Sequence, residues 1–321
     1  MNTSVLITGG TGYLGSRIVQ HLARDPKFDL SVLTHRESPI QRECFPSVRT
    51  VAGDLCDESA LESACKNIDC IVHLAALNEI DCAAQPEQAM MVNGIGTMKL
   101  LNAARASGVE KFIYFSTAHV YGAPLTGTLS EECLPRPIHP YAVSHRTAED
   151  FVLAAHSQQQ LTGIVLRLSN ALGAPAHATI QRWTLIGNDL CRQAILHHRL
   201  VLRSSGQQRR DFIPLSDVAR AVNHFINLPP AACGDGLFNL GGDCPMRIVD
   251  LARKIADRCN IVLGFKPDLI IGGDGSPEPE SFLDYQIKKL KETGFVPQGD
   301  LDSEIDDTLK LCASAFGKSN G

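Results

Sequence analysis

The stretch that decides the fold is T-G-G-T-G-Y-L-G at residues 8–15. A β-branched run, Ser4–Thr8, precedes it, and apolar residues follow at Leu14, Ile18 and Leu22, which are four residues apart. The run predicts a strand and the spacing predicts an amphipathic helix, so the glycines form the turn between them. Glycine there permits a tight turn and lets a pyrophosphate approach the helix N-terminus. The expected dinucleotide contacts are Gly9, Gly12, Tyr13, Leu14 and Gly15.

The same alternation of strand and helix continues through the first half of the chain. We predict strands at 30–34, 70–74, 111–116 and 163–168, and helices at 58–66, 87–107 and 141–158. Strands that alternate with helices need crossover connections, which favours a parallel sheet covered on both faces. The sequence therefore predicts a doubly wound α/β fold, with a dinucleotide-binding domain at residues 1–168.

The alternation loosens after residue 168. Loops rich in Gly, Pro and Arg separate predicted helices at 188–197, 216–227 and 248–259. We expect a smaller C-terminal α/β substrate domain, mainly residues 169–321. The segment F-N-L-G-G at 238–242 reads as a strand that returns to the first sheet, so the first domain regains segments near 210–242.

Composition excludes several classes of protein. The 321 residues are 44% hydrophobic and 20% charged with a formal net charge of −5, so the chain lacks the basic surface that nucleic-acid binding needs. No apolar stretch approaches the roughly 20 residues that span a bilayer. Eleven cysteines are scattered without any C-x-x-C spacing, which predicts neither a metal site nor a disulfide framework. With no signal peptide evident, we expect a cytoplasmic protein.

The end of the second predicted strand bears on cofactor choice. A carboxylate normally holds the ribose 2′-hydroxyl there, but this chain reads Thr34, His35, Arg36. Arg36, with His35, can instead pair with a 2′-phosphate, which favours NADP(H) and leaves NAD(H) possible. The alternative is that Arg36 is a solvated loop cation. Further cofactor contacts are expected after the third and fourth strands, at Asp54, Leu55, Ala75 and Ala76.

Tyr141 and His145 lie four residues apart on one predicted helix, so they share a face. Upstream, Thr117 ends a strand in F-S-T-A-H-V-Y-G. With the glycine turn, these residues resemble the extended short-chain dehydrogenase/reductase family, in its nucleotide-sugar epimerase, dehydratase and ketoreductase branch. The resemblance covers nearly the whole chain and implies a Rossmann-type sheet. It includes V-N-G-I-G-T at 92–97, L-R-L-S-N-A-L-G at 166–173, R-D-F-I-P-L-S-D-V-A-R at 210–220 and F-N-L-G-G at 238–242.

The resemblance implies a catalytic set with one departure. Thr117 would hydrogen-bond the sugar oxygen at the reacting carbon, and Tyr141 would be the acid/base. The family's lysine, which lowers the tyrosine pKa and binds the nicotinamide ribose, is replaced by His145 in Y-A-V-S-H. Imidazole is mostly neutral at pH 7 and would carry charge only below its own pKa, near 6.5. Three alternatives stay open: His145 is a partial substitute, the acid/base lies elsewhere, or the protein binds without turnover.

The resemblance also suggests the substrate contacts. Dehydratases commonly carry Asp-Glu, or end in Glu, before V-Y-G, whereas this chain has Ala118 and His119, which disfavours dehydration. His119 can move a proton, or it is a loop histidine bonded to backbone. Asn170 matches a contact to the sugar-phosphate region, and Arg210 matches the arginine that clamps the diphosphate. Asn188 is either a substrate-facing amide or part of a helix N-cap.

These observations lead to one leading function. We expect NADPH-dependent reduction of a 4-keto nucleotide-activated sugar. An epimerase that retains its cofactor and a catalytically silent dinucleotide-binding regulator are the alternatives. The helices at 87–107 and 141–158 resemble those that pair two family subunits, so a homodimer is expected, with Leu100, Val143 and Phe151 partly facing the partner.

Overall fold

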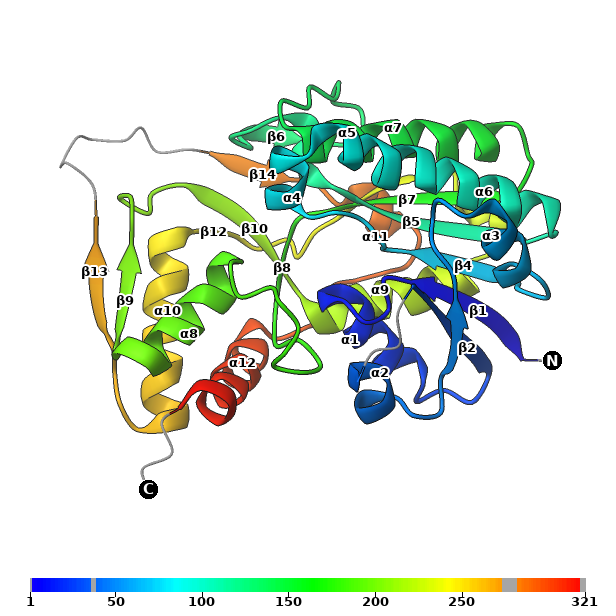
Figure 1. The fold of residues 1–321 in the computed structure, drawn as a ribbon. Helices are drawn as coiled ribbons and strands as arrows, with labels where there is room; N and C mark the ends of the chain where they lie inside the picture. Colours follow the sequence, from blue (N-terminus) through cyan, green and yellow to red (C-terminus); the bar gives the residue numbers. More distant parts are fainter. Residues whose placement is uncertain (1, 36–38, 273–281, 318–321) are drawn as a thin grey trace.

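The computed structural model describes residues 2–35, 39–272 and 282–317. Its centre is a seven-stranded, wholly parallel sheet, and the predicted Rossmann-type α/β fold is confirmed (Figure 1). The strands are β1 (Thr3–Thr8), β2 (Phe28–Thr34), β3 (Arg49–Ala52), β4 (Cys70–His73), β5 (Lys111–Thr117), β7 (Thr162–Leu168) and β11 (Leu237–Leu240). They lie side by side in the order β11-β7-β5-β4-β1-β2-β3.

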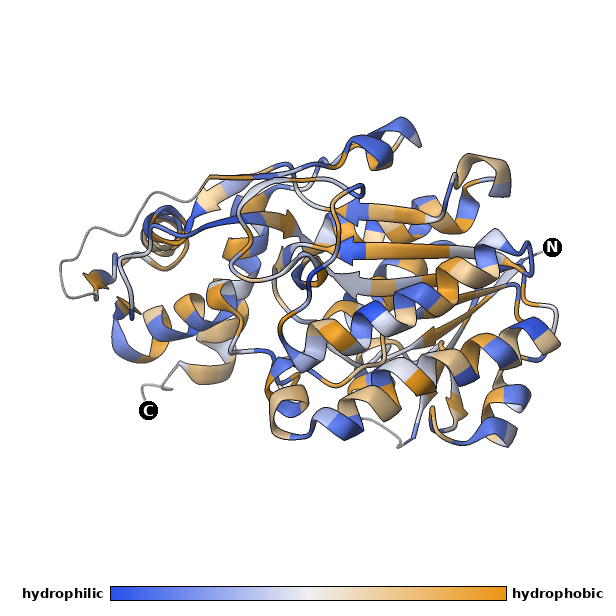
Figure 2. Cartoon of the chain, turned by 90° about the horizontal axis from the view of Figure 1, so that it is seen from above, coloured by the Kyte–Doolittle hydropathy of each residue, from blue (hydrophilic) through white to orange (hydrophobic). Residues whose placement is uncertain are grey.

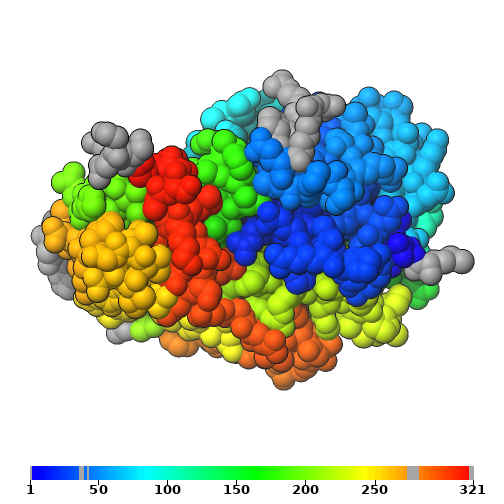
Figure 3. Space-filling view, turned by 90° about the horizontal axis from the view of Figure 1, so that it is seen from below, coloured from blue at the N-terminus to red at the C-terminus, as the bar shows by residue number. Residues whose placement is uncertain are grey.

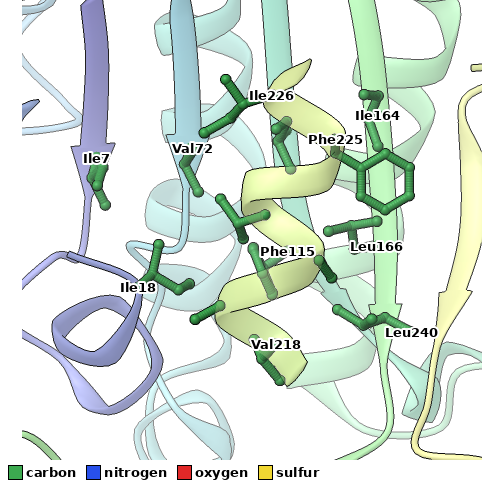
Figure 4. Close-up of a cluster of buried hydrophobic side chains, with 14 of the residues drawn as sticks. Ile7, Ile18, Val72, Phe115, Ile164, Leu166, Val218, Phe225, Ile226 and Leu240 are labelled. Carbon is green, nitrogen blue, oxygen red and sulfur yellow. The ribbon is translucent and has the colours of Figure 1, made fainter. Parts of the chain in front are cut away.

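Helices cover both faces of this sheet. Helices α1 (Tyr13–Leu22) and α9 (Leu215–Asn227) pack on one face, and α3 (Glu58–Ala64), α6 (Gly96–Ala106) and α7 (Pro140–Ser157) pack on the other. Successive side chains of a strand point to opposite faces of the sheet, so each strand contributes to two hydrophobic cores. Val5 and Ile7 face α1 and α9, while Leu6 faces the helices on the other side. Figure 4 shows the first core, with Phe225 of α9 near the strand residues. In Figure 2 the central strands are mostly orange, whereas the helices carry both colours.

The single helix predicted at 87–107 is interrupted. Helix α5 (Pro86–Ala89) leads into a π-helical stretch at Met90–Ile95, and α6 follows. The wider turn contains Asn93, which is buried and accepts a hydrogen bond from the Leu77 backbone N–H at 2.8 Å. The Asn93 amide donates to the Ser144 hydroxyl at 3.0 Å. The π-turn thus ties the loop after β4 to α7, and such turns often occur near functional sites.

The C-terminal part has a core of its own. Helices α8 (Ile186–His197), α10 (Ile248–Leu263) and α12 (Leu301–Phe316) pack together there. Two small sheets accompany them: β8 (Asn170–Leu172) with β10 (Arg209–Pro214) and β12 (Pro245–Arg247), and β9 (Arg199–Leu202) with β13 (Asp268–Ile271). A third small sheet, β6 (Gly127–Leu129) with β14 (Leu283–Tyr285), packs against the first core instead. Strand β11 pairs with β7, the place expected for residues 238–242. The domain boundary at residue 168 stays a prediction.

An ion pair joins the two parts of the molecule. Figure 3 shows the red α12 against both the yellow α10 and the blue N-terminal residues. Arg17 of α1 lies 3.1 Å from the buried Glu304 carboxylate of α12. Glu304 also accepts the backbone N–H of Ser216, at 2.8 Å, from the start of α9. This carboxylate therefore fixes the C-terminal core against the helices that cover the first sheet.

The residues expected at a subunit contact divide into two kinds. Leu100 is fully buried in the core between α6 and the sheet, so it has no surface left for a partner. Phe151 is partly buried against the same core. Val143 is 40% exposed and remains available for a partner. Met91, which was not among the expected residues, is 47% exposed in the π-helical stretch before α6. None of the described helices is long and apolar enough to cross a membrane.

Candidate active site

A cavity of about 510 Å³ opens at the carboxyl ends of β1, β4, β5 and β7. The strand order reverses between β1 and β4, so the chain leaves these two strands in opposite directions and a crevice forms between them. Segments of the C-terminal part, residues 179–182 and 185–187 with Arg210 and Phe212, form the opposite wall. The cavity therefore lies between the cofactor-binding motif and the second core.

The glycine turn forms one end of the cavity. The Gly12 N–H donates to the Gly9 carbonyl at 2.9 Å, and Gly9 has a φ of +68°, in the left-handed region. A Cβ at Gly15 would lie 2.1 Å from the Gly9 carbonyl oxygen, so only glycine allows this packing. Helix α1 has neither a side-chain cap nor an acidic residue in its first turn, which leaves its N-terminal N–H groups for an anion. The cavity-lining residues predicted for the cofactor are Gly9, Gly12, Tyr13, Leu14, Gly15, Ala75 and Ala76.

Other residues predicted for the cofactor lie outside this cavity. Asp54 is exposed, and its carboxylate accepts the Cys56 N–H at 2.8 Å within its own turn. Leu55 is buried against α6, where a Cβ on Gly96 would approach it to 3.1 Å. His35 is exposed after β2, and Arg36 falls outside the described residues. Their contacts to the adenosine half stay predictions.

The residues predicted for catalysis lie together. Thr117 ends β5, while Tyr141 and His145 lie on the first turns of α7, and all three line the cavity. The Tyr141 and His145 rings meet edge to face with centroids 4.5 Å apart. His139 caps α7, since its ring nitrogen accepts the Tyr141 N–H at 3.2 Å. His119 also lines the cavity, and its backbone N–H donates to the Thr117 hydroxyl at 3.2 Å.

Burial governs the protonation of this cluster. Desolvation raises the pKa of Tyr141 well above its ordinary value, and the Glu79 carboxylate adds to the rise, although Arg182 and a hydrogen bond with Thr117 oppose it. Burial lowers the pKa of His145 to about 4. This agrees with the expectation that His145 is mostly neutral at pH 7, and it moves the pH at which the imidazole gains its charge below the ordinary value near 6.5. At neutral pH the site holds a protonated phenol and a neutral imidazole.

His145 has one bonded and one unbonded ring nitrogen. Its Nδ1 lies 2.6 Å from the hydroxyl of Tyr114, a buried residue of β5. Its Nε2 is buried and has no hydrogen-bond partner. A buried polar atom without a partner is costly, so this nitrogen suits a ligand hydroxyl. Together with the uncapped α1 N-terminus, it makes the site fit a nicotinamide dinucleotide, whose ribose and pyrophosphate offer those groups.

The same burial makes folding pH-dependent. His73 is buried with a pKa lowered to about 3, and His145 has a pKa of about 4. The unfolded chain binds protons at both sites below about pH 6.5 while the folded chain does not, so the unfolding free energy falls as pH drops. We expect a loss of about 1.4 kcal/mol per histidine, or about 3 kcal/mol in total, from pH 7.5 to 5.5. Urea unfolding at both pH values measures it.

A variant isolates the contribution of one histidine. His73→Asn should lose roughly half of this pH dependence, whatever its stability at pH 7.5. Equal stability of the wild type at pH 7.5 and 5.5 would contradict the assignment of two neutral buried histidines.

The residues predicted for substrate binding are only partly in the cavity. Asn170 and Arg210 line it. The Asn170 amide donates to the Asp211 carbonyl at 3.0 Å, and Arg210 donates to Gln208 at 3.2 Å. Asn188, by contrast, is buried outside the lining, and its amide donates to the Arg182 carbonyl at 3.2 Å. The prediction that Asn188 faces the substrate is not supported, because its amide is used to hold the cavity wall.

Sequence reasoning missed one ion pair in this cavity. Glu79, at the start of α4 (Glu79–Ala84), pairs with Arg182 at 3.1 Å, and both line the cavity. Desolvation and the Arg210 guanidinium lower the pKa of His119, and the Glu79 carboxylate partly opposes this shift. The sequence did contain a signal for Glu79, because this residue closely follows β4 and functional groups gather at the carboxyl ends of parallel strands. No group of three metal-ligating side chains occurs within the described ranges.

The fold and this site define a Rossmann-type, dinucleotide-dependent enzyme. Residues 5–241 match the NAD dependent epimerase/dehydratase family, and the chain belongs to that family. It is 28% identical to the dTDP-D-glucose 4,6-dehydratase of Mus musculus, with 97% of this chain and 89% of that protein covered. It is 30% identical to the UDP-glucose 4-epimerase of Azospirillum brasilense, with 95% and 90% covered.

The fold of this chain is also similar to that of a solved nucleotide-sugar epimerase structure. The UDP-N-acetylglucosamine 4-epimerase from Methanobrevibacter ruminantium M1, in complex with UDP-N-acetylmuramic acid, superimposes with a TM-score of 0.81 at 26% identity. The similarity covers 98% of this chain and 99% of that one. Likeness over the full length extends the family assignment to the C-terminal part.

Proposed function

We propose that this chain is an NAD(P)-dependent 4-ketoreductase, which reduces C4 of a nucleotide-activated sugar. The observation that carries the proposal is that Tyr141 lines one cavity with the glycine turn and Thr117, with its ring against that of His145, where burial keeps the phenol protonated. Reduction of a ketone needs a proton donor at the carbonyl oxygen, and a phenol held protonated is such a donor. When bound, the nicotinamide ring supplies the hydride.

Each remaining residue has a proposed role toward the ligands. The glycine turn at α1 binds the pyrophosphate through backbone N–H groups, and Nε2 of His145 binds the nicotinamide ribose. Thr117 hydrogen-bonds the reacting oxygen beside Tyr141. Asn170 and Arg210 receive the sugar and diphosphate of the substrate, since a planar cation suits phosphate oxygens. His119 is the second proton carrier in the cavity if Tyr141 is not the acid.

An epimerase is the second candidate, favoured by the 30% identity to a UDP-glucose 4-epimerase. An epimerase must first oxidise C4, and that step needs Tyr141 as a base. A raised phenol pKa opposes this role, because phenolate then forms only at high pH. Dehydration lacks support at Ala118 and His119, where the dehydratases commonly carry acidic residues. A silent regulator remains the alternative if His145 cannot replace lysine.

One experiment separates these functions. The purified protein is analysed by mass spectrometry for bound nucleotide, then incubated with 4-keto nucleotide sugars and NADPH deuterated at the transferred position. A ketoreductase consumes the cofactor stoichiometrically, places deuterium at C4 and exchanges its nucleotide freely. Interconversion of sugars without net NADPH consumption, with a retained nucleotide, would instead establish the epimerase. Binding without any hydride exchange would establish the regulator.

We also propose a preference for NADP(H), because Thr34, His35 and Arg36 replace the expected acid after β2. Arg36→Ala should weaken NADPH binding by about tenfold or more, the cost of one charge-assisted hydrogen bond, and leave NADH binding unchanged. Dissociation constants for both nucleotides on both proteins test this. Tighter NADH binding by the wild type, or equal weakening of both nucleotides, would contradict the preference.

The proposal extends to assembly and location. A homodimer through α6 and α7 would cover the exposed Met91 and Val143. A cytoplasmic enzyme agrees with eleven free cysteines, which suit a reducing compartment. A nucleotide sugar is the proposed small-molecule partner, with no role for nucleic acid or membrane.

A further inference from the structure

Tyr114 makes a contact that the mechanism above does not use. It lies on β5, is buried, and its hydroxyl is 2.6 Å from Nδ1 of His145. Burial raises its pKa well above the ordinary value, so the hydroxyl keeps its proton. Across the described chain this hydroxyl has no other hydrogen-bond partner. Tyr114 therefore has one hydrogen to donate, and His145 has the nearest acceptor.

The hydrogens of this pair can be arranged in two ways. If Tyr114 donates to Nδ1, the neutral ring carries its proton on Nε2, and that N–H is the only group left without a partner. If Nδ1–H donates to Tyr114 instead, both the phenolic hydrogen and the Nε2 lone pair are unsatisfied. Buried polar groups without partners cost free energy, so the first arrangement, with one such group, is favoured over the second, with two.

The neighbouring ring cannot take the Tyr114 hydrogen. His73 lies 5.6 Å from Tyr114, measured between ring centroids, and both of its nitrogens are bonded. The Thr8 hydroxyl accepts the N–H groups of Leu74 and Ala75, so its own hydrogen goes to Nδ1 of His73 at 2.6 Å. Nε2–H of His73 then donates to Thr97 at 2.9 Å. His73 has no free acceptor for Tyr114.

We propose that Tyr114 is a positioning residue that holds His145 as the Nε2–H tautomer, with this N–H as the hydrogen-bond donor to a ligand in the cavity. The identity of that ligand group as a ribose hydroxyl rests on the proposed function. A lysine at this position is always a donor, whereas a free imidazole can be either donor or acceptor. The hydrogen bond from Tyr114 makes the neutral histidine a donor like the lysine, without its charge.

The tautomer can be measured directly. Nitrogen-15 NMR of histidine-labelled protein, with His145 assigned by loss of its signals in His145→Gln, should show a protonated Nε2 and an unprotonated Nδ1 in the wild type. Tyr114→Phe should shift both signals toward a mixture of tautomers. The matched control is Tyr285→Phe, which removes another buried hydroxyl, 2.7 Å from the Arg167 carbonyl, and should leave His145 unchanged. A wild-type His145 protonated on Nδ1 would overturn the proposal, whether or not Tyr114→Phe folds.

Binding gives a second, independent test. Tyr114→Phe should weaken NADPH binding about tenfold, similar to the loss of the outer partner of a metal-bound histidine. In a His145→Lys background the same change should not weaken NADPH binding, because a lysine ammonium donates hydrogen bonds in its only protonated form and has no tautomer for Tyr114 to select. Equal effects in both backgrounds would overturn the positioning role. If the wild type binds no dinucleotide, the proposed function is wrong, and the NMR result alone then decides the role of Tyr114.

Discussion

Replacement of Tyr141 by phenylalanine should lower kcat about 10³-fold and leave NADP(H) binding nearly unchanged. The change removes only the phenolic oxygen, which is the proton donor in the proposed reduction, and a positioned acid contributes about 10²- to 10⁴-fold. The ring remains, so its edge-to-face contact with His145, 4.5 Å between centroids, is kept. Single-turnover rates and cofactor dissociation constants measure the two effects separately.

A control distinguishes loss of the acid from loss of structure. Tyr121→Phe removes a hydroxyl that donates to Asn239 at 2.7 Å, outside the cavity lining, and should retain kcat. Near-normal turnover of Tyr141→Phe on the true substrate would show that another group supplies the proton. His119 would then be the first residue to replace, because it lines the same cavity.

The fold could be predicted because its signals are local. The glycine turn at residues 8–15 and the alternation of strand and helix depend on neighbouring residues, and they led to the observed parallel sheet. The helix at 87–107 was only partly predicted, since its π-helical turn holds Asn93 against Leu77 and Ser144, two contacts with distant elements. Periodicity along one segment carries no information about such contacts.

In the candidate site, too, features set by local motifs could be predicted and features set by contacts between distant residues could not. The approach of Thr117, Tyr141 and His145 was predicted from motifs. A neutral His145 at pH 7 was also expected, but the further drop of its pKa was not, because that drop depends on burial by residues far away in the chain. For Asn188 the sequence left two roles open for a related reason: an amide near a helix start looks the same whether it faces a ligand or bonds a backbone carbonyl. Tertiary contacts decide such cases.

A buried ion pair behind the site was also invisible to motif reasoning. Glu149 of α7 is fully buried and accepts two hydrogen bonds from Arg167 of β7, at 3.0 and 2.8 Å. It also accepts from the Ser116 hydroxyl at 2.5 Å, next to Thr117. The guanidinium of Arg167 stacks on the Tyr121 ring, with its carbon 4.7 Å from the centroid. One carboxylate thus joins β5, β7 and α7 at the base of the cavity.

Loss of this carboxylate should destabilise the protein strongly. Glu149→Gln leaves the Arg167 guanidinium, which is 1% exposed, without a compensating charge, and it also removes the 3.1 Å ion pair of Glu149 with the partly exposed Arg146, which keeps Asp150. Breaking a buried pair in this way costs about 3–5 kcal/mol of unfolding free energy. The matched control is Asp150→Asn, which breaks an exposed pair with Arg146 and should cost less than about 1 kcal/mol. Urea unfolding of the three proteins at pH 7.5 gives the comparison.

A double replacement separates the charge from the packing. Glu149→Leu with Arg167→Met removes both charges and fills similar volume, and apolar replacement of a whole buried pair is often neutral or stabilising. We therefore expect the double variant to be more stable than Glu149→Gln. Its kcat should still fall, because the Ser116 hydroxyl loses its acceptor beside Thr117 and the end of β5 is held less firmly. If Glu149→Gln lowers the unfolding free energy no more than Asp150→Asn does, then water reaches Arg167. In that case the Glu149–Arg167 pair is not what holds β5, β7 and α7 together.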